Sequence, residues 1–164
     1  MMSDKRCFLQ WFVLLLSFAT ITFFAGYYGL LRMVWETDVT HMTSVIGGVF
    51  IAAIVYLGIA SWRYDNPRRF IATAIADTGV GKTASYIVTL IGLLGTVIGL
   101  TLQVKAMANI NLSDQANMIA FVKAVSSSLG TAFYATGCGI IGSIGIIAMT
   151  ANLEYFIDRD EVTQ

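Results

Sequence analysis

Four long stretches of this chain contain no Asp, Glu, Lys, Arg or His, and charged residues or a histidine bound each of them. These stretches are residues 7–31, 42–62, 83–104 and 124–153. A helix that crosses a bilayer needs roughly 20 apolar residues, and each stretch meets that length. We therefore predict an all-α integral membrane protein with about four transmembrane helices.

The first stretch follows Lys5 and Arg6, as the apolar core of a signal peptide does. Such a core has only about 7–15 residues and ends at small side chains. Because this stretch is longer and rich in Phe, we expect an anchor that stays in the membrane.

Basic residues are distributed unevenly between the two sides of the predicted bundle. With four spans, one side carries seven Lys and Arg residues and the other side carries three. The richer side contains Lys5, Arg6, Arg63, Arg68, Arg69, Lys82 and Arg159. Since loops rich in Lys and Arg stay in the cytoplasm, we expect both termini there.

Composition and charge exclude several other classes of protein. Hydrophobic residues make up 57% of the chain and charged residues 12%, about half the charged share of an average soluble domain. The formal net charge is zero and no dense basic cluster suggests nucleic-acid binding. Cys7 and Cys138 have no Cys or His neighbour at metal-ligand spacing, so we expect no disulfide, metal or cofactor. No nucleophile, base and orienting group stand together, so we predict no enzyme.

The sequence divides into an N-terminal transmembrane hairpin (residues 1–62), a short cytoplasmic loop (63–82) and a C-terminal helix pair (83–164). In the loop, Pro67 suits the first position of a short amphipathic helix that we expect on the membrane surface. Residues 76–83 read ADTGVGKT, a loose form of the P-loop. A true P-loop needs a preceding strand and a surrounding sheet, so we interpret these residues as a flexible turn.

Between the third and fourth stretches, Asn109, Asn111 and Ser113 form a polar turn. Ser113 can cap a helix that begins at Asp114, and apolar residues follow at helical spacing. The fourth span is therefore predicted to begin outside the bilayer and to continue through it as one long helix.

Small and hydroxyl-bearing residues form one face of each of the last two stretches. On the third stretch they are Thr89, Gly92, Thr96, Gly99 and Gln103, and on the fourth they are Ala132, Thr136, Gly139, Ser143 and Thr150. Most follow one another at steps of three or four, which places each set on one helix face. Such a face suits tight helix packing or an ion path lined by hydroxyls and carbonyls. Spacing alone favours packing, although both interpretations can hold together.

The absence of charge from all four stretches constrains any ion path. A charge at the bilayer centre costs about 2.5–3.5 kcal/mol on insertion scales, so chains carry one there mainly for function. A proton relay normally uses such a residue. If this protein conducts protons, another chain must supply the titrating group.

Two motifs on the same helices resemble those of one known family. Residues 93–100 read LLGTVIGL and residues 128–139 read SLGTAFYATGCG. These resemble the outgoing and returning helices of the MotA/TolQ/ExbB family, whose motifs are close to GLLGTVxG and AL-x-x-T-x-x-G. The resemblance covers roughly residues 85–157, about half of the chain.

The resemblance implies a proton channel subunit in the bacterial inner membrane. Family members form pentamers around two copies of a single-pass partner similar to MotB, TolR or ExbD, whose transmembrane Asp carries the proton. The resemblance thus implies a motor complex in which ion flow drives rotation between the two and converts proton-motive force into mechanical work. The resemblance makes Thr96 and Thr136 pore-facing residues that accept or relay hydrogen bonds. It makes neighbouring small residues part of the lining: Gly92, Gly99, Gly139 and Ser143. Ala135, directly before Thr136, is typical of proton-driven rather than sodium-driven members.

The sequence also departs from the family pattern and leaves alternatives open. The returning helix lacks the proline of many members, and residues 143–146 read SIGI there. The loop of residues 63–82 is far shorter than the cytoplasmic region of flagellar stators, which leaves a TolQ/ExbB-like system or a minimal or phage-borne relative. A structural scaffold, such as a holin, assembled through its glycine-rich faces is the alternative function. A solute transporter is less favoured, because no ionisable residue or broken helix marks a midplane site.

Overall fold

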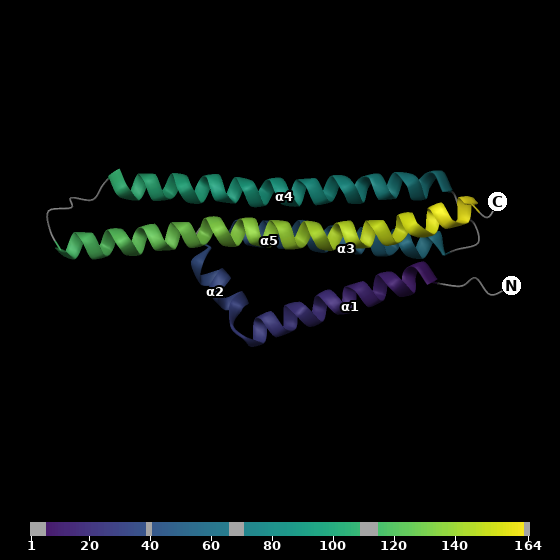
Figure 1. The fold of residues 1–164 in the computed structure, drawn as a ribbon, viewed down its shortest axis with the longest axis horizontal. Helices are drawn as coiled ribbons and strands as arrows, with labels where there is room; N and C mark the ends of the chain where they lie inside the picture. Colours follow the sequence, from purple (N-terminus) through teal and green to yellow (C-terminus); the bar gives the residue numbers. More distant parts are fainter. Residues whose placement is uncertain (1–5, 39–40, 66–70, 109–114, 163–164) are drawn as a thin grey trace.

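The computed structural model describes residues 6–38, 41–65, 71–108 and 115–162, and this part of the chain is almost entirely helical. The helices are α1 (Arg6–Tyr27), α2 (Leu30–Thr37), α3 (Met42–Tyr64), α4 (Ile71–Ala108) and α5 (Gln115–Val162) (Figure 1). All of them except α2 are long and apolar enough to cross a membrane. The predicted all-α membrane protein with four spanning helices is confirmed, whereas the orientation of its termini stays a prediction.

The first predicted span is interrupted near its C-terminal end. Helix α1 ends at Tyr27, and Gly29 takes the left-handed conformation with φ of 75°, which glycine adopts without steric cost. The chain then turns back through α2 towards the rest of the bundle (Figure 1). Asp38 follows α2, and its Oδ2 accepts the Thr43 backbone N–H at 2.7 Å, which satisfies a free donor in the first turn of α3.

Helices α4 and α5 run antiparallel, side by side, and form the longest part of the molecule (Figure 1). They contain 38 and 48 residues, which at 1.5 Å per residue gives about 57 Å and 72 Å. Both exceed the hydrocarbon core of a bilayer, about 30 Å thick, so the pair must extend beyond the membrane. The prediction of one long fourth helix is confirmed from Gln115 onward, and its expected cap at Ser113 lies outside the described residues.

The beginning of α4 corrects the expected structure of the loop. Residues 71–82 belong to α4, so the expected turn at Gly79 and Gly81 and the separate surface helix are wrong for these residues. Pro67 lies outside the described residues. Buried side chains continue at helical spacing through this segment, at Ala74, Thr78, Ser85 and Val88. Their packing offsets the cost of each glycine in a helix, about 1 kcal/mol. The P-loop-like motif is therefore helical, and no strand precedes it in the described residues.

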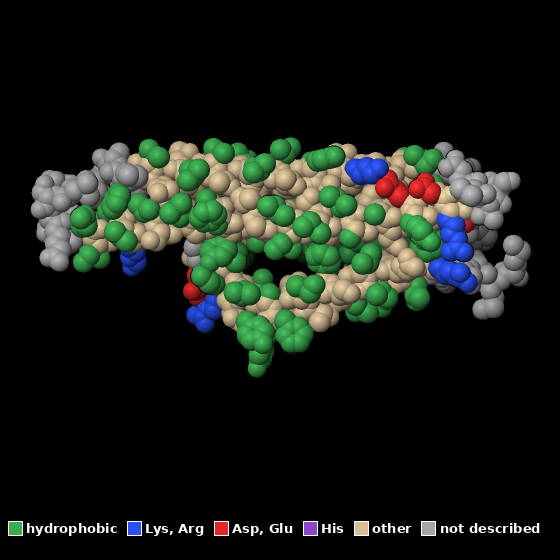
Figure 2. Space-filling view, in the orientation of Figure 1, with side chains coloured by type: hydrophobic (Ala, Val, Ile, Leu, Met, Phe, Trp, Pro, Cys, Tyr) green, Lys and Arg blue, Asp and Glu red, His purple; other side chains and the backbone are tan. Residues whose placement is uncertain are grey.

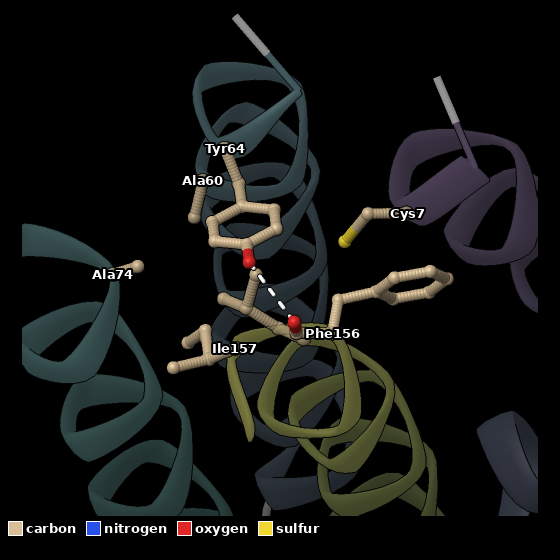
Figure 3. Packing of buried hydrophobic residues seen from close by; sticks show 7 residues of the cluster. Cys7, Ala60, Tyr64, Ala74, Phe156 and Ile157 are labelled. Carbon is tan, nitrogen blue, oxygen red and sulfur yellow. Dashed lines mark hydrogen bonds between the residues drawn. The ribbon is translucent and has the colours of Figure 1, made fainter. Parts of the chain in front are cut away.

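Four helix ends meet where α1 and α4 begin and α3 and α5 end, and we call this the termini end. The Tyr64 hydroxyl lies 3.0 Å from the Phe156 carbonyl oxygen (Figure 3). It also lies 2.7 Å from Asp160 Oδ2. Asp65 Oδ2 accepts the Phe8 backbone N–H at 2.9 Å and so caps α1 from the end of α3. Buried apolar side chains fill this end: Cys7, Ala60, Tyr64, Ala74, Leu153, Phe156 and Ile157.

A second buried cluster lies further along the bundle and joins α1, α3, α4 and α5. Its members are Trp11, Ile46, Ala53, Leu57, Val88, Ile146 and Met149. Many large apolar side chains elsewhere are exposed, and they are spread along the whole visible face of the molecule (Figure 2). An exposed apolar surface of this extent suits contact with lipid or with other membrane helices.

Candidate ion path

Small residues bring the backbones of α4 and α5 into direct contact. A Cβ atom added at Gly92 would lie 3.0 Å from the Ala135 carbonyl oxygen and 3.1 Å from Gly139 Cα. A Cβ atom at Gly139 would lie 2.9 Å from Gly92 Cα, and one at Gly99 would lie 2.9 Å from Ala132 Cβ. Only glycine leaves room at these positions, as expected where helices pack through small residues.

Thr96 and Thr136 face each other within this contact. Their hydroxyl groups hydrogen-bond to each other across the two helices. Thr96 Oγ1 also lies 3.3 Å from the Gly92 carbonyl oxygen and 3.4 Å from that of Ala132. Thr136 Oγ1 lies 3.3 Å and 3.2 Å from the same two carbonyl oxygens. Two hydroxyls and two carbonyls therefore form one polar cluster, which we call the threonine cluster.

The threonine cluster contains more acceptors than donors. Each hydroxyl has one proton and two lone pairs, and each carbonyl oxygen has two lone pairs. The helical N–H groups of residues 96 and 136 also donate to these carbonyls, but with the two hydroxyl protons they still fill only part of the lone pairs, so the cluster can receive a hydrogen bond from an additional donor. A protonated carboxyl group, a water molecule or a hydrated cation has the required chemistry.

The threonine cluster lies on the side of the α4–α5 contact that α3 leaves open. A Cβ atom at Gly95 would approach Met42 of α3, and one at Gly142 would approach Phe50 and Ile46 of the same helix. Thr96 follows Gly95 by one residue, which turns it about 100° around α4 and away from α3. Both threonines remain partly exposed in the single chain.

The other predicted lining residues lie close to the cluster but are buried. Gly92, Gly99 and Gly139 are enclosed by the α4–α5 contact, and Ser143 is 8% exposed one turn beyond Gly139. Elsewhere on the two faces, hydroxyls bond to their own helices, as Thr89 does to the Ser85 carbonyl at 3.0 Å. The role of Gly92, Gly99, Gly139 and Ser143 in lining a pore stays a prediction.

An ion pair that was not predicted from the sequence lies on the open side of the α4–α5 contact, near the termini end. Lys82 Nζ on α4 lies 2.5 Å from Glu154 Oε1 on α5. Both line a pocket of about 390 Å³ together with Thr78 and Asp158. Lys82 and Thr96 are fourteen residues apart, which places them on the same side of α4. The seven-residue spacing of Lys82, Thr89 and Thr96 was the one feature of the sequence that could have placed Lys82 on the side of the threonine cluster.

The described residues offer little to bind a metal. No three His, Cys, Asp or Glu side chains come together in them. Between Lys82 and Lys105 on α4, and between Lys123 and Glu154 on α5, the sequence has no Asp, Glu, Lys, Arg or His. The polar chemistry of the membrane-embedded part therefore comes from hydroxyls and backbone carbonyls.

Comparison with known proteins identifies the family. The sequence model of the MotA/TolQ/ExbB proton channel family matches residues 68–163, which is more than half of the chain and includes all of α4 and all of α5. No curated protein and no solved structure gives a match. The match includes both motifs from which the resemblance was predicted and also reaches the helical segment before them. The chain is thus a multi-pass membrane protein of the proton-channel type and belongs to the MotA/TolQ/ExbB proton channel family.

Proposed function

We propose that this chain is the proton-conducting subunit of a motor complex that converts proton-motive force into mechanical work on a single-pass partner. The observation that carries the proposal is the threonine cluster, an acceptor-rich site on the open side of α4 and α5. The partner supplies a transmembrane Asp, because the spans of this chain contain no Asp, Glu, Lys, Arg or His. When protonated, that Asp donates a hydrogen bond to the cluster, and when ionised it does not.

The side chains around the threonine cluster support a pore in which the partner helix lies against the open side of α4 and α5. Leu93 and Leu100 lie one turn before and after Thr96, and they are 50% and 45% exposed. Ile140 lies one turn after Thr136 and is 49% exposed. Around Thr96 and Thr136 the open side is thus apolar apart from the threonine cluster itself. A partner helix with one carboxyl group would find one place on this wall where that group is favoured.

We propose that the subunit assembles as a homopentamer around its partner in the bacterial inner membrane, with both termini in the cytoplasm. Family membership supports this arrangement, and the exposed apolar faces of α4 and α5 provide surface for neighbouring subunits. Thr96 and Thr136 are proposed to face the pore. Gly92, Gly99, Gly139 and Ser143 are proposed to lie behind them and to hold the two helices close enough for the hydroxyls to meet.

We propose protons rather than sodium as the coupling ion. Ala135, the residue before Thr136, is fully buried and meets the Cβ position of Gly95. A second hydroxyl there would have to fit into the close contact between α4 and α5. A sodium path through two adjacent threonines is therefore disfavoured at this position.

A structural scaffold remains the second candidate function, because the small residues of α4 and α5 contact each other within one chain. That observation accounts for the glycines without any pore. It does not account for the family match or for the unused acceptors of the threonine cluster. The scaffold requires no partner with a transmembrane carboxyl group, whereas the motor does.

Native mass spectrometry of the tagged chain, extracted gently from its own host's membrane, distinguishes the two functions. Five copies of this 17.8 kDa chain with a small single-pass protein that carries a transmembrane Asp support the motor. Copies of the chain alone, under conditions that preserve a known complex of the family, contradict it and favour the scaffold.

A further inference from the structure

Helix α1 contacts α3 closely at one end and separates from it towards the other. Near the termini end, a Cβ atom added at Gly58 would lie 2.5 Å from Cζ2 of Trp11, so the two helices touch there. Further along α3, a Cβ atom at Gly47 would meet nothing within 4 Å. Helix α2 then leads back to the bundle, so α1, α2 and α3 surround the space between them (Figure 1).

This space is an apolar hollow of about 720 Å³. It is visible as a dark gap between α1 and the rest of the bundle (Figure 2). Leu15 and Phe23 of α1, Leu31 of α2 and Ile54 of α3 contribute to its lining. Thr22 also lines it, but the Thr22 hydroxyl already donates its proton to the Phe18 carbonyl at 2.9 Å. The hollow therefore offers almost nothing to bind water.

The position of the hollow along α1 matches one leaflet of a bilayer. Tyr27, Tyr28 and Trp35 are 78%, 75% and 65% exposed at its outer end. Exposed Tyr and Trp side chains mark the level of lipid head groups. From Leu15 to Tyr27 the helix rises about 18 Å, slightly more than half of a hydrocarbon core about 30 Å thick. The hollow thus extends from the head-group level to the middle of the membrane.

We propose that the hollow is a lipid-binding site, occupied by an acyl chain of a phospholipid whose head group lies beside Tyr27 and Tyr28. Water is excluded from so apolar a space because it would lack hydrogen-bond partners, whereas hydrocarbon surrounds the helices at this depth. The acyl chain contacts three helices at once, unlike a lipid on the outer surface of the bundle. It fills the gap between α1 and α3 and keeps α1 in its splayed position.

Two adjacent glycines provide a test and its control. Gly47 lines the hollow and Gly48 does not, and a Cβ atom at either position would meet nothing within 4 Å. Gly47→Leu places a side chain where the acyl chain lies, whereas Gly48→Leu adds the same side chain elsewhere on the same turn. Both variants should fold, because the Cβ atom has open space at both positions and leucine is a better helix former than glycine.

The three proteins are extracted in mild detergent and weighed by native mass spectrometry. They are also placed in nanodiscs of phosphatidylcholine with a photoreactive diazirine midway along one acyl chain. We expect the wild type and Gly48→Leu to retain a phospholipid and to be labelled within residues 15–27 and 47–54. Gly47→Leu should lose the retained lipid and several-fold of that label, at an unchanged melting temperature.

The proposal is overturned if Gly47→Leu retains lipid and label as the wild type does. Label spread evenly over all exposed apolar faces, including Leu9 and Val13, also contradicts it. Covalent adducts between two chains through residues 15–27 would show that a second copy of the protein occupies the hollow instead.

Discussion

Thr96 and Thr136, forty residues apart in the chain, hydrogen-bond to each other across the contact between α4 and α5. The same two backbone carbonyls, those of Gly92 and Ala132, lie within 3.4 Å of both hydroxyls. Each hydroxyl can therefore donate within its own helix or across the contact. Helix packing and an ion path were alternative interpretations of the same small-residue faces. This arrangement joins them, because close packing at the glycines brings the hydroxyls together on an open side.

Thr136→Val tests whether the hydroxyl of Thr136 serves ion conduction. Valine has nearly the same shape but removes one donor and its acceptor, so the partner carboxyl group loses part of its site. We expect loss of proton flux in vesicles from the host membrane, while native mass spectrometry shows the same assembly. Thr96→Val should have the same effect on flux.

Thr101→Val is the matched control for the two threonine variants. Thr101 is exposed on α4, and its hydroxyl donates to the Val97 carbonyl of its own helix at 2.8 Å. Its replacement should leave proton flux unchanged, as should Leu94→Ala. Normal flux in Thr136→Val would contradict the assignment of this hydroxyl to the ion path.

Gly139→Ala tests the close contact between α4 and α5. The added methyl group would lie 2.9 Å from Gly92 Cα and 3.1 Å from the Val88 carbonyl oxygen, so the backbones must separate. We expect a loss of about 1–3 kcal/mol in the free energy of unfolding, as for other overpacked contacts. Unfolding of the purified protein in detergent, followed by circular dichroism, measures the change.

The control for this variant lies two residues earlier. A Cβ atom at Gly137 would meet nothing within 4 Å, so Gly137→Ala only improves helix propensity. It should be neutral or stabilising by about 0.5–1 kcal/mol. Equal destabilisation by both variants would mean that the contact at Gly139 does not limit the packing of these helices.

The sequence was sufficient to predict the elements whose signals are local. Helix α3 (Met42–Tyr64) closely follows the uncharged residues 42–62, and α5 continues through its span as expected. The break at Gly29 was not predicted, because the apolar run continues past it while the backbone turns. Helix α4 began earlier than expected because packing against α3 and α5 outweighs the low helix propensity of Gly79 and Gly81. Such packing depends on residues distant in the sequence.

The candidate site was predictable only in part. Helical spacing placed Thr96 and Thr136 on the small faces of their own helices, and the family resemblance selected them. No pattern along one chain reveals that their hydroxyls meet or that they share the carbonyls of Gly92 and Ala132. The pairing of Lys82 with Glu154 depends on the register between α4 and α5, which the sequence of either helix alone does not determine.

Gly79→Ala tests the helical structure of the P-loop-like residues 76–83. In α4 a Cβ atom at Gly79 would meet nothing within 4 Å, so alanine should be neutral or stabilise the protein by about 0.5–1 kcal/mol. Gly81→Ala should be destabilising, because its methyl group would collide with Thr150 Oγ1 and lie 3.1 Å from Leu57 Cδ2. Thermal unfolding of the two variants gives the comparison. A flexible nucleotide-binding loop predicts a different result, namely stabilisation of the wild type by ATP and its loss in both variants.

Asp65→Ala tests the cap that holds the beginning of α1 against the end of α3. The carboxylate accepts the Phe8 backbone N–H, so its removal leaves a helix-terminal donor unsatisfied, at a cost of about 0.5–2 kcal/mol. We expect faster amide hydrogen exchange in residues 6–11, with little change in α4 and α5. Asp77→Ala is the control, because it also removes a carboxylate near this end, one that accepts the Tyr56 hydroxyl at 2.6 Å. Exchange in residues 6–11 should be unchanged in that variant. If both variants accelerate exchange equally, the effect comes from the lost negative charge and not from the cap.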